Sequence, residues 1–294
     1  MIVITAPTST IGSQVLETLV SSGERVRVIA RDPARLPTHM RERIEVLQGS
    51  HSDINIVNQA FEGADAVFWL VPPDPQAKTL EAAYVDFTRP ACAAFKSQAM
   101  NRVVGISALG RGTTIAAHAG LVTASLAMDD LIANSGVNYR ALTMPSFMDN
   151  IIRQVVPIKT QGMFFSPISG DRKMPACATR DIAASAVRLL RDATWSGPGQ
   201  LAVLGPEDIS FNDMAKVISD VLGKPVRYQQ ISFETYKSWF TGFGMSEAMA
   251  QGMTDMASAK NDGLDNAESR APDNTTPTSF RQWCEEILKP AVLG

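Results

Sequence analysis

Cysteine and histidine are scarce in this chain of 294 residues, with three of each. The cysteines, Cys92, Cys177 and Cys284, lie far apart and form no CxxC pair. A disulfide framework or a zinc site needs several cysteines, or a cluster of cysteine and histidine, at close spacing. We therefore expect three reduced and buried thiols, as in a cytoplasmic protein, and no metal site.

An excess of charge of either sign is also missing. The chain has 27 basic and 30 acidic side chains, which gives a formal net charge of −3. Proteins that bind nucleic acid or an anionic membrane surface usually carry a strong basic balance. We expect neither a nucleic acid nor a membrane among the partners of this protein.

Long apolar runs are absent as well. A membrane-spanning helix needs roughly 18 apolar residues, and no segment approaches that length. The first residues read as a strand, without the regions of a signal peptide, so we expect a cytoplasmic protein. For its oligomeric state we expect a monomer or a homodimer. The HExxH and GxSxG motifs are missing too, which argues against metalloprotease and acyl-transfer chemistry.

Apolar runs and helical patterns alternate through the first half of the chain. The apolar runs predict six strands, at Ile2–Ile4, Val26–Ala30, Ile44–Leu47, Ala66–Val71, Val103–Ile106 and Tyr139–Leu142. Strands that are apolar throughout are typical of a parallel sheet covered on both faces. The sequence predicts an α/β fold of the Rossmann type, a doubly wound parallel sheet that binds ligands at the carboxyl ends of its strands.

The alternation breaks after about residue 150. Later segments predict helices at 181–190, 211–222 and 280–288, and strands at 199–204 and 226–231. We interpret residues 1–150 as a dinucleotide-binding domain, with returning segments near 175–205. Residues 151–294 would form a smaller α/β domain on the substrate side.

The turn after the first strand keeps one glycine where dinucleotide-binding proteins usually have three. It reads TAPTSTIG, residues 5–12. The remaining Gly12 stands where helix and strand must touch, and the anion site itself comes from N–H groups at the helix start. We expect Ser9, Thr10 and Ile11 to donate these N–H groups, and we include Thr8 in the same site. The alternative is that these residues only cap the helix.

Two arginines follow the second strand. Arg31 lies 19 residues after Gly12, at the strand end where NAD-specific proteins place an acidic residue. A guanidinium there suits a 2′-phosphate, and Arg35 could add a second contact. The pair favours NADP(H), with NAD(H) as the alternative cofactor, unless the two arginines only occupy a solvated loop.

Seven segments together resemble one known family over essentially the whole chain. They are VITAPTSTIGSQV (3–15), VRVIARDP (26–33), GADAVFWLVPP (63–73), VVGISALG (103–110), LIANSGVNYRALTMPSFMDN (131–150), RDIAASAVRLL (180–190) and LAVLGPEDISFNDMAKVISDVLGKPVRY (201–228). The chain resembles the NmrA-like atypical short-chain dehydrogenases and reductases. That group includes quinone-oxidoreductase-like and isoflavone-reductase-like enzymes and NADP-sensing regulators.

The resemblance implies cofactor contacts at the strand ends. Thr5 would line the diphosphate together with Thr10 and Ile11, and Arg31 would bind the 2′-phosphate. Three further segments would contact the rest of the cofactor: Leu70, Val71 and Pro72 beneath the adenosine and nicotinamide riboses, Ser107 and Ala108 beside the nicotinamide, and Pro145, Ser146 and Phe147 over it.

The chain departs from the family after the fifth strand. Short-chain reductases have Tyr-x-x-x-Lys on the next helix, where the lysine lowers the tyrosine pKa. Here the two positions hold Leu121 and Ser125, which cannot replace the tyrosine and lysine, although Ser125 stays among the candidate catalytic residues with Ser107 and His118. Ser107 takes the place of the catalytic serine and can only polarise. His118, predicted one turn before Leu121 on a helix over about 114–133, is the best candidate proton donor, unless it is a surface histidine. Tyr84, on the preceding long helix, is a weaker candidate.

A second departure follows the third strand, where the family often has Gly-Asp and this chain has Gly49-Ser50.

Aromatic and methionine side chains indicate a small hydrophobic or aromatic substrate. The residues that we expect to line its pocket are Trp69, Tyr84, Phe147, Met148 and Phe165. From Trp239 onward, a helical segment carries Phe240, Phe243, Met245, Met249, Met253 and Met256 on one face. Such a stripe is usually core or a subunit contact, and the alternative is a deformable lid over the substrate.

Three functions fit these features. The first is an NADPH-dependent reductase of a conjugated carbonyl, a quinone or a similar aromatic compound. Its hydride comes from the cofactor, and a conjugated acceptor needs little acid catalysis. The second is a non-catalytic NADP(H)-sensing regulator, which the missing tyrosine and lysine favour. The third is an isomerase, a dehydratase or a tailoring enzyme of secondary metabolism.

Overall fold

A computed structural model describes every residue from Met1 to Gly294. The chain forms two compact units, each assembled from separate stretches. Unit 1 comprises residues 1–108, 124–143 and 182–201, and unit 2 comprises residues 109–123, 144–181 and 202–294. The sequence analysis placed the boundary near residue 150, with returning segments near 175–205. In the structure unit 1 leaves out residues 109–123, ends its main part at Thr143 and regains residues 182–201.

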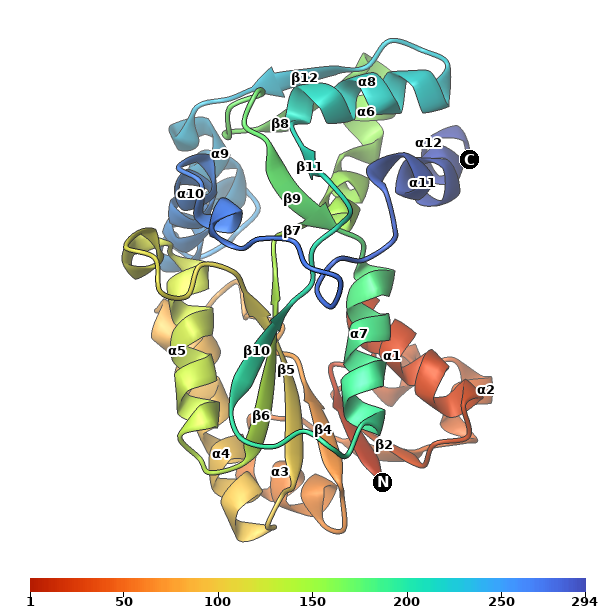
Figure 1. The fold of residues 1–294 in the computed structure, drawn as a ribbon, viewed down its shortest axis with the longest axis vertical. Coiled ribbons are helices and arrows are strands. Elements are labelled where there is room, and N and C mark those ends of the chain that lie inside the picture. Colours follow the sequence, from red (N-terminus) through yellow and green to blue (C-terminus); the bar gives the residue numbers. More distant parts are fainter. The chain divides into compact units, whose positions relative to one another are not determined.

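A seven-stranded sheet forms the centre of unit 1, in the order β10-β6-β5-β4-β1-β2-β3 (Figure 1). Its strands are β1 (Ile2–Thr5), β2 (Val26–Ala30), β3 (Glu45–Gln48), β4 (Ala66–Trp69), β5 (Arg102–Ala108), β6 (Asn138–Met144) and β10 (Gly199–Ala202). The pairs β1–β2, β2–β3, β1–β4 and β4–β5 are parallel. This order, with β1 between β2 and β4, confirms the predicted doubly wound α/β fold.

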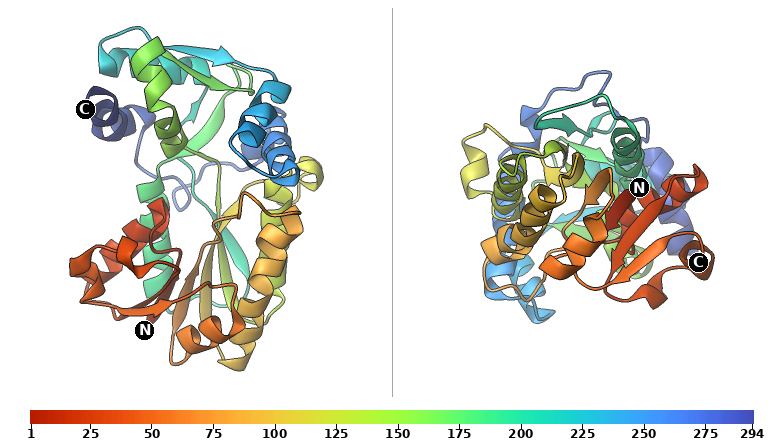
Figure 2. Two further views of the ribbon diagram at one scale, coloured as in Figure 1. Left: turned by 180° about the vertical axis from the view of Figure 1, so that it is seen from behind. Right: turned by 90° about the horizontal axis from the view of Figure 1, so that it is seen from below.

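Helices cover both faces of this sheet, as the view from below shows (Figure 2). They are α1 (Thr10–Ser21), α2 (Thr38–Arg41), α3 (Ile54–Phe61), α4 (Phe87–Ser97), α5 (Leu121–Ala133) and α7 (Thr179–Arg191). A π-helical turn, η2 (Ala82–Asp86), precedes α4. The wide turn ends four residues before Pro90, which has no N–H to donate back to Asp86.

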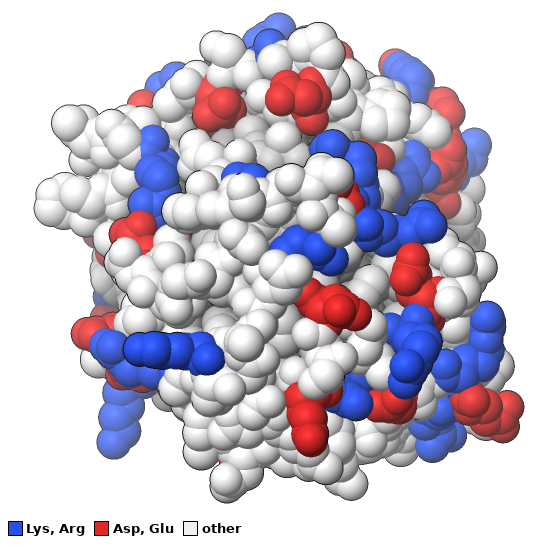
Figure 3. Space-filling view, turned by 60° about the horizontal axis from the view of Figure 1, so that its bottom comes forward, with Lys and Arg blue, Asp and Glu red and all other residues white.

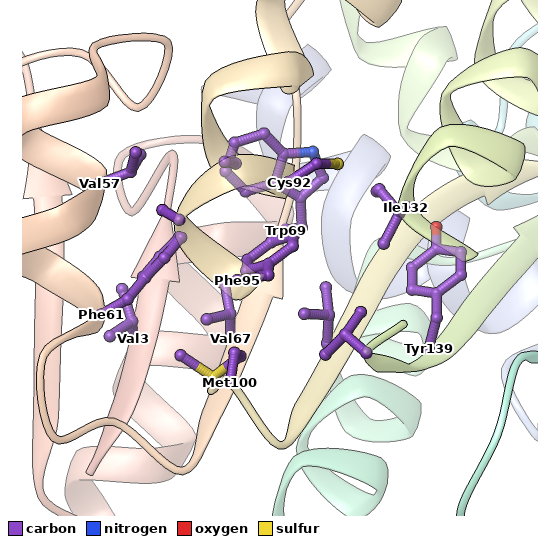
Figure 4. Close-up of a cluster of buried hydrophobic side chains, with 14 of the residues drawn as sticks. Val3, Val57, Phe61, Val67, Trp69, Cys92, Phe95, Met100, Ile132 and Tyr139 are labelled. Carbon is purple, nitrogen blue, oxygen red and sulfur yellow. The ribbon is translucent and has the colours of Figure 1, made fainter. Parts of the chain in front are cut away.

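One hydrophobic core of unit 1 lies between the sheet and helices α3, α4 and α5. Val3 and Val67, from the neighbouring strands β1 and β4, share this cluster with Phe61 and Phe95 (Figure 4), and Val103 of β5 belongs to it as well. Trp69 is fully buried in the same cluster, with its ring edge-on to Phe95. Trp69 was expected to line the substrate pocket, and that expectation is wrong because its side chain has no exposed surface.

Unit 2 contains two small sheets, β11-β9-β7 and β12-β8. Their strands are β7 (Ser146–Phe147), β8 (Met163–Ser166), β9 (Met174–Cys177), β11 (Asp208–Ile209) and β12 (Arg227–Gln230). The helices are η3 (Ile115–His118), η4 (Met148–Gln154), α6 (Val155–Gln161), α8 (Phe211–Leu222), α9 (Phe233–Gly242), α10 (Glu247–Asn261), η5 (Leu264–Ala267), α11 (Phe280–Trp283), η6 (Cys284–Leu288) and α12 (Lys289–Leu293). None of the chain's helices combines the length and the apolar character needed to cross a membrane.

The core of unit 2 includes a residue that the sequence placed in the substrate pocket. Met148 is 2% exposed and packs with Phe164, Ile218 and Phe280. The expectation for Met148 is therefore wrong, because its side chain is part of the hydrophobic core. All three cysteines are buried and unpaired, as predicted.

The predicted helix over 114–133 is interrupted. The 3₁₀ turn η3 ends at His118, and α5 begins only at Leu121. Between them Gly120 has φ +55°, and a Cβ there would lie 2.2 Å from the carbonyl oxygen of Gly252. The contact of this turn with α10 thus requires glycine, and glycine in this conformation ends one helical segment before the next begins.

Charged side chains of both signs are interspersed on the face drawn in Figure 3, with no patch of a single sign over it. This distribution agrees with the nearly balanced composition of 27 basic and 30 acidic residues.

Candidate active site

The turn from β1 to α1 holds Ala6 in a left-handed backbone conformation, with φ +47°. Residues other than glycine rarely adopt this conformation. The Ala6 carbonyl accepts hydrogen bonds from the N–H of Ser9 at 3.0 Å and from its hydroxyl at 2.8 Å. Ala6 therefore adopts the backbone conformation that glycine usually adopts in such a turn, and it differs from glycine only by its methyl group.

Gly12 meets this turn from the first turn of α1. A Cβ on Gly12 would lie 2.2 Å from the Ala6 carbonyl oxygen and 2.8 Å from Ser9 Oγ. No side chain fits at such distances from backbone. This contact explains why the last glycine of the loop is present while the others are replaced.

Ser9 caps α1. Its hydroxyl accepts the N–H of Gly12 at 3.0 Å, and its own N–H is bonded to Ala6. The expectation that Ser9 donates its N–H to the cofactor is wrong, because that group is already paired. Thr10 and Ile11 begin the helix, where N–H groups have no partner within the helix. Their role, and that of the partly exposed Thr8, stays a prediction.

Thr5 is fully buried at the end of β1. Its hydroxyl lies 3.0 and 3.2 Å from the carbonyl oxygens of Phe68 and Leu70, and it accepts the N–H of Leu70 at 2.8 Å. Thr5 thus fixes the end of β4, where Leu70 and Val71 are buried and Pro72 is partly exposed. A contact of Thr5 with a diphosphate would have to come from its backbone.

Arg31 and Arg35 are exposed just after β2, and neither is in an ion pair with a carboxylate. The acid between them, Asp32, accepts the N–H of Ala34 at 3.1 Å and caps the short turn Pro33–Arg35. Both guanidinium groups are therefore free to bind an anion.

His51, after β3, belongs to the same end of the sheet, and the sequence reasoning missed it. Its Nε2 lies 3.1 Å from the Leu70 carbonyl oxygen, and its ring meets Trp69 and Phe87 edge-on at 5.1 and 4.7 Å. The pKa of His51 is lowered to about 4, mainly by burial, with a smaller contribution from repulsion by Arg31. The imidazole is neutral at pH 7 and donates to Leu70. The sequence signal for this segment was the departure from the family just before His51, where Ser50 follows Gly49 in place of the usual aspartate.

Ser107 and Ser125, both predicted, come together in unit 1, with their oxygens 3.5 Å apart. Asp129, one turn after Ser125 on α5, accepts a short hydrogen bond from the Ser107 hydroxyl. The Tyr139 hydroxyl donates to the other oxygen of Asp129 at 2.6 Å. Sequence reasoning missed Asp129 and Tyr139, although a buried acid on an apolar helix face needs partners. Ser107 was expected to polarise a substrate, but its proton is directed to Asp129.

The remaining cofactor residues lie in different units. Ala108 is partly exposed at the end of β5 in unit 1. Pro145 is buried, whereas Ser146 and Phe147 are partly exposed in β7 of unit 2. His118 is exposed on η3, also in unit 2, and not on α5 as predicted. The contacts of these residues with cofactor or substrate stay predictions.

The candidate substrate residues differ in exposure. Tyr84 packs partly buried against the core of unit 1, and burial raises its pKa to about 12, which makes it a poor acid. In unit 2, Phe165 meets Trp239 edge-on at 5.8 Å. Trp239 is 41% exposed, and Phe243, at the end of α9, is 92% exposed.

The apolar stripe after Trp239 consists of two helices. No residue of α9 is buried, whereas Met249 and Ala250 of α10 are. The two helices are separated by a turn at Gly244, which has the left-handed φ of +83°. Core packing thus accounts for α10, whereas the interpretation of α9 as a lid stays a prediction.

The sequence of the chain matches two family models and several known proteins. The model of an NAD(P)H-binding family matches residues 8–193, and the model of the NmrA-like family matches residues 128–285. The chain is 27% identical to the NAD(P)H azoreductase of Xenophilus azovorans over 258 residues, 87% of this chain and 86% of that protein.

Solved structures show the same fold. A complex of the NADPH-dependent quinone oxidoreductase of Escherichia coli with NADPH has a TM-score of 0.79 at 20% identity and covers 96% of this chain and 98% of that one. The triphenylmethane reductase of Citrobacter sp. with NADP(H) has a TM-score of 0.78 at 17% identity, with 100% and 99% covered. The chain therefore belongs to the NmrA-like family of NAD(P)H-binding oxidoreductases.

Proposed function

We propose that this protein transfers a hydride from NADPH to a flat conjugated acceptor, a quinone or a similar aromatic compound. The observation that carries the preference for NADPH is the pair of exposed arginines after β2, Arg31 and Arg35, which no carboxylate neutralises. A 2′-phosphate offers the charge that such a pair binds best. The names of the relatives, an azoreductase and reductases of quinones and triphenylmethane compounds, support an aromatic acceptor.

The residues of unit 1 fit a dinucleotide. The start of α1 offers the N–H groups of Thr10 and Ile11 to a diphosphate. Thr5 and His51 hold the Leu70 backbone from two sides, which fixes the strand end on which the riboses would rest. Bound NADPH would supply the hydride, and the work of the protein is orientation.

Acid catalysis has few candidates in this chain. Leu121 and Ser125 stand at the tyrosine and lysine positions, and the hydroxyl proton of Ser107 is directed to Asp129. A quinone that accepts a hydride becomes a delocalised anion, which can take its proton from water or from an exposed group such as His118. An isolated carbonyl would need a stronger and better positioned acid.

The aromatic side chains of α9 are the proposed contacts for the acceptor. Trp239 and Phe165 present an edge-to-face pair, and Tyr236 and Phe240 form a second pair at 4.8 Å. Partly exposed rings of this kind stack on flat apolar molecules.

An acceptor panel tests the proposal. Purified protein is mixed with NADPH and a naphthoquinone, an azo dye or an unconjugated ketone, and the loss of reduced nicotinamide absorbance is followed. We expect turnover with the conjugated acceptors and at least about 100-fold less with the ketone, as the missing acid requires. Equal turnover with the ketone would contradict the proposed mechanism.

The second candidate is the NADP(H)-sensing regulator, which the absent proton donor at Leu121 and Ser125 favours. In that case the protein binds NADP(H) but oxidises it with none of the acceptors.

A further inference from the structure

A buried carboxylate lies behind the candidate serine of unit 1. Asp129 is 3% exposed, and Ser107 and Tyr139, which donate to its two oxygens, are 7% and 2% exposed. Burial of a carboxylate is costly unless hydrogen bonds compensate for the lost water. Here two hydroxyl groups from neighbouring strands, β5 and β6, provide them.

The sheet makes room for this arrangement at Gly105. A Cβ there would lie 2.3 Å from the Tyr139 hydroxyl oxygen and 2.8 Å from its ring. Gly105 and Ser107 are two residues apart on β5 and therefore face the same side of the sheet. The absent side chain at one position lets Tyr139 reach the acid that Ser107 also contacts.

The arrangement fixes the direction of the Ser107 hydroxyl. The Ser107 hydroxyl donates its one proton to a carboxylate oxygen of Asp129. The Ser107 oxygen can then only accept: one lone pair faces the Ser125 hydroxyl at 3.5 Å, and the other remains for a further donor. A serine in this state offers an acceptor at the carboxyl end of β5, where the fold binds its ligands.

We propose that Asp129 is a positioning residue, which holds Ser107 as a hydrogen-bond acceptor for the nicotinamide half of the dinucleotide. The group accepted would be an N–H or O–H of that half, its carboxamide or its ribose. This inference rests on the proposed function, since it requires dinucleotide binding at this edge of the sheet.

Replacement of Asp129 by leucine tests the proposal, because leucine has a similar size and no acceptor. Without the carboxylate, the Ser107 proton is free to turn toward the ligand, where it opposes another donor. The probes are NADP⁺ and adenosine 2′,5′-bisphosphate, which lacks the nicotinamide half. Calorimetric titration should show about tenfold weaker NADP⁺ binding, the loss of one good hydrogen bond. Binding of the bisphosphate should change less than about twofold.

A double-mutant cycle separates positioning from general damage. If Asp129 acts through Ser107, Asp129→Leu should cause no further loss of NADP⁺ affinity in a Ser107→Ala background. The matched control is Asp130→Leu, which changes the exposed neighbouring acid on the same helix and should leave both affinities unchanged.

Three results would overturn the inference. They are equal weakening of both probes by Asp129→Leu, additive losses in the double variant, or unchanged NADP⁺ binding in Ser107→Ala. If Asp129→Leu does not fold, Ser107→Ala decides alone, since it must weaken NADP⁺ about tenfold and spare the bisphosphate. Failure of the wild-type chain to bind either probe would contradict the proposed function itself, and this inference with it.

Discussion

The α-carbon of Gly12 packs directly on the carbonyl oxygen of Ala6, so that a Cβ would approach that oxygen to 2.2 Å. The two residues stand at the last and the first glycine positions of a dinucleotide turn. Gly12 must remain glycine because of this contact, whereas Ala6 keeps its methyl group at the left-handed φ of +47°.

Gly12→Ala should therefore destabilise the turn. Because backbone lies on the other side of the contact, α1 must shift, at a cost of about 1–3 kcal/mol in the free energy of unfolding. NADPH binding should fall with it. Thermal unfolding and calorimetry measure the two effects. Ser13→Ala, at the next and exposed position of α1, is the control and should change neither; a stable Gly12→Ala protein with normal binding would contradict this account of the loop.

Ala6→Gly should relieve strain. A left-handed alanine costs about 1–2 kcal/mol, and the added freedom of glycine in the unfolded chain takes back up to about 1 kcal/mol. We expect the free energy of unfolding to stay equal or rise by up to about 1 kcal/mol in denaturant titrations. Ala99, with φ +49°, is a matched site away from the loop and should respond alike. A loss above about 1 kcal/mol at Ala6 alone would show that its methyl group makes needed contacts.

The stability of the protein should depend on pH through His51. The folded pKa is about 4 against an ordinary 6.5, so the unfolded chain takes up a proton first as the pH falls. The free energy of unfolding should therefore decrease between pH 6.5 and pH 4, by about 3 kcal/mol from this residue.

His51→Gln isolates this effect, because glutamine can still donate to Leu70 and does not titrate. Urea titrations from pH 7 to pH 4 should give a shallower slope for the variant than for the wild type. Parallel slopes would mean that His51 is not buried as described.

His118→Ala tests the candidate proton donor. If His118 delivers a proton in the reaction, kcat with a quinone should fall about 10- to 100-fold, while the Kd for NADPH stays constant. His39→Ala, which removes an exposed histidine of unit 1, is the matched control. An unchanged kcat at every pH would exclude His118 as the donor and leave water in that role.

The sequence predicted the sheet well because its strands are continuous apolar runs. Val26–Ala30 was predicted to the residue, and the first strand, Ile2–Thr5, differs by one. Short strands of unit 2, such as β7 and β9, were missed, since two to four residues carry no periodic pattern. The turn at Gly120 was also missed, because the glycine is required by a contact with Gly252, far away in sequence.

The site was predictable where a local pattern specifies a chemical group, and less so where burial decides. Arg31 followed from its position after β2. Trp69 and Met148 were misassigned because sequence position does not tell which face of a segment is covered. The group around Asp129 could not be found, since its partners come from β5 and β6, which only the folded sheet brings together.

The central claim is that the arginines after β2 bind the 2′-phosphate of NADPH. Calorimetric titration of the wild type, Arg31→Ala and Arg41→Ala with NADPH and NADH tests it most directly, with Arg41 as an exposed control arginine on α2. We expect the wild type to prefer NADPH, and Arg31→Ala to lose at least about tenfold in NADPH affinity, the worth of one charge-assisted contact. NADH affinity, and both affinities in Arg41→Ala, should change little. Equal losses for both nucleotides in Arg31→Ala, or no preference in the wild type, would contradict the account.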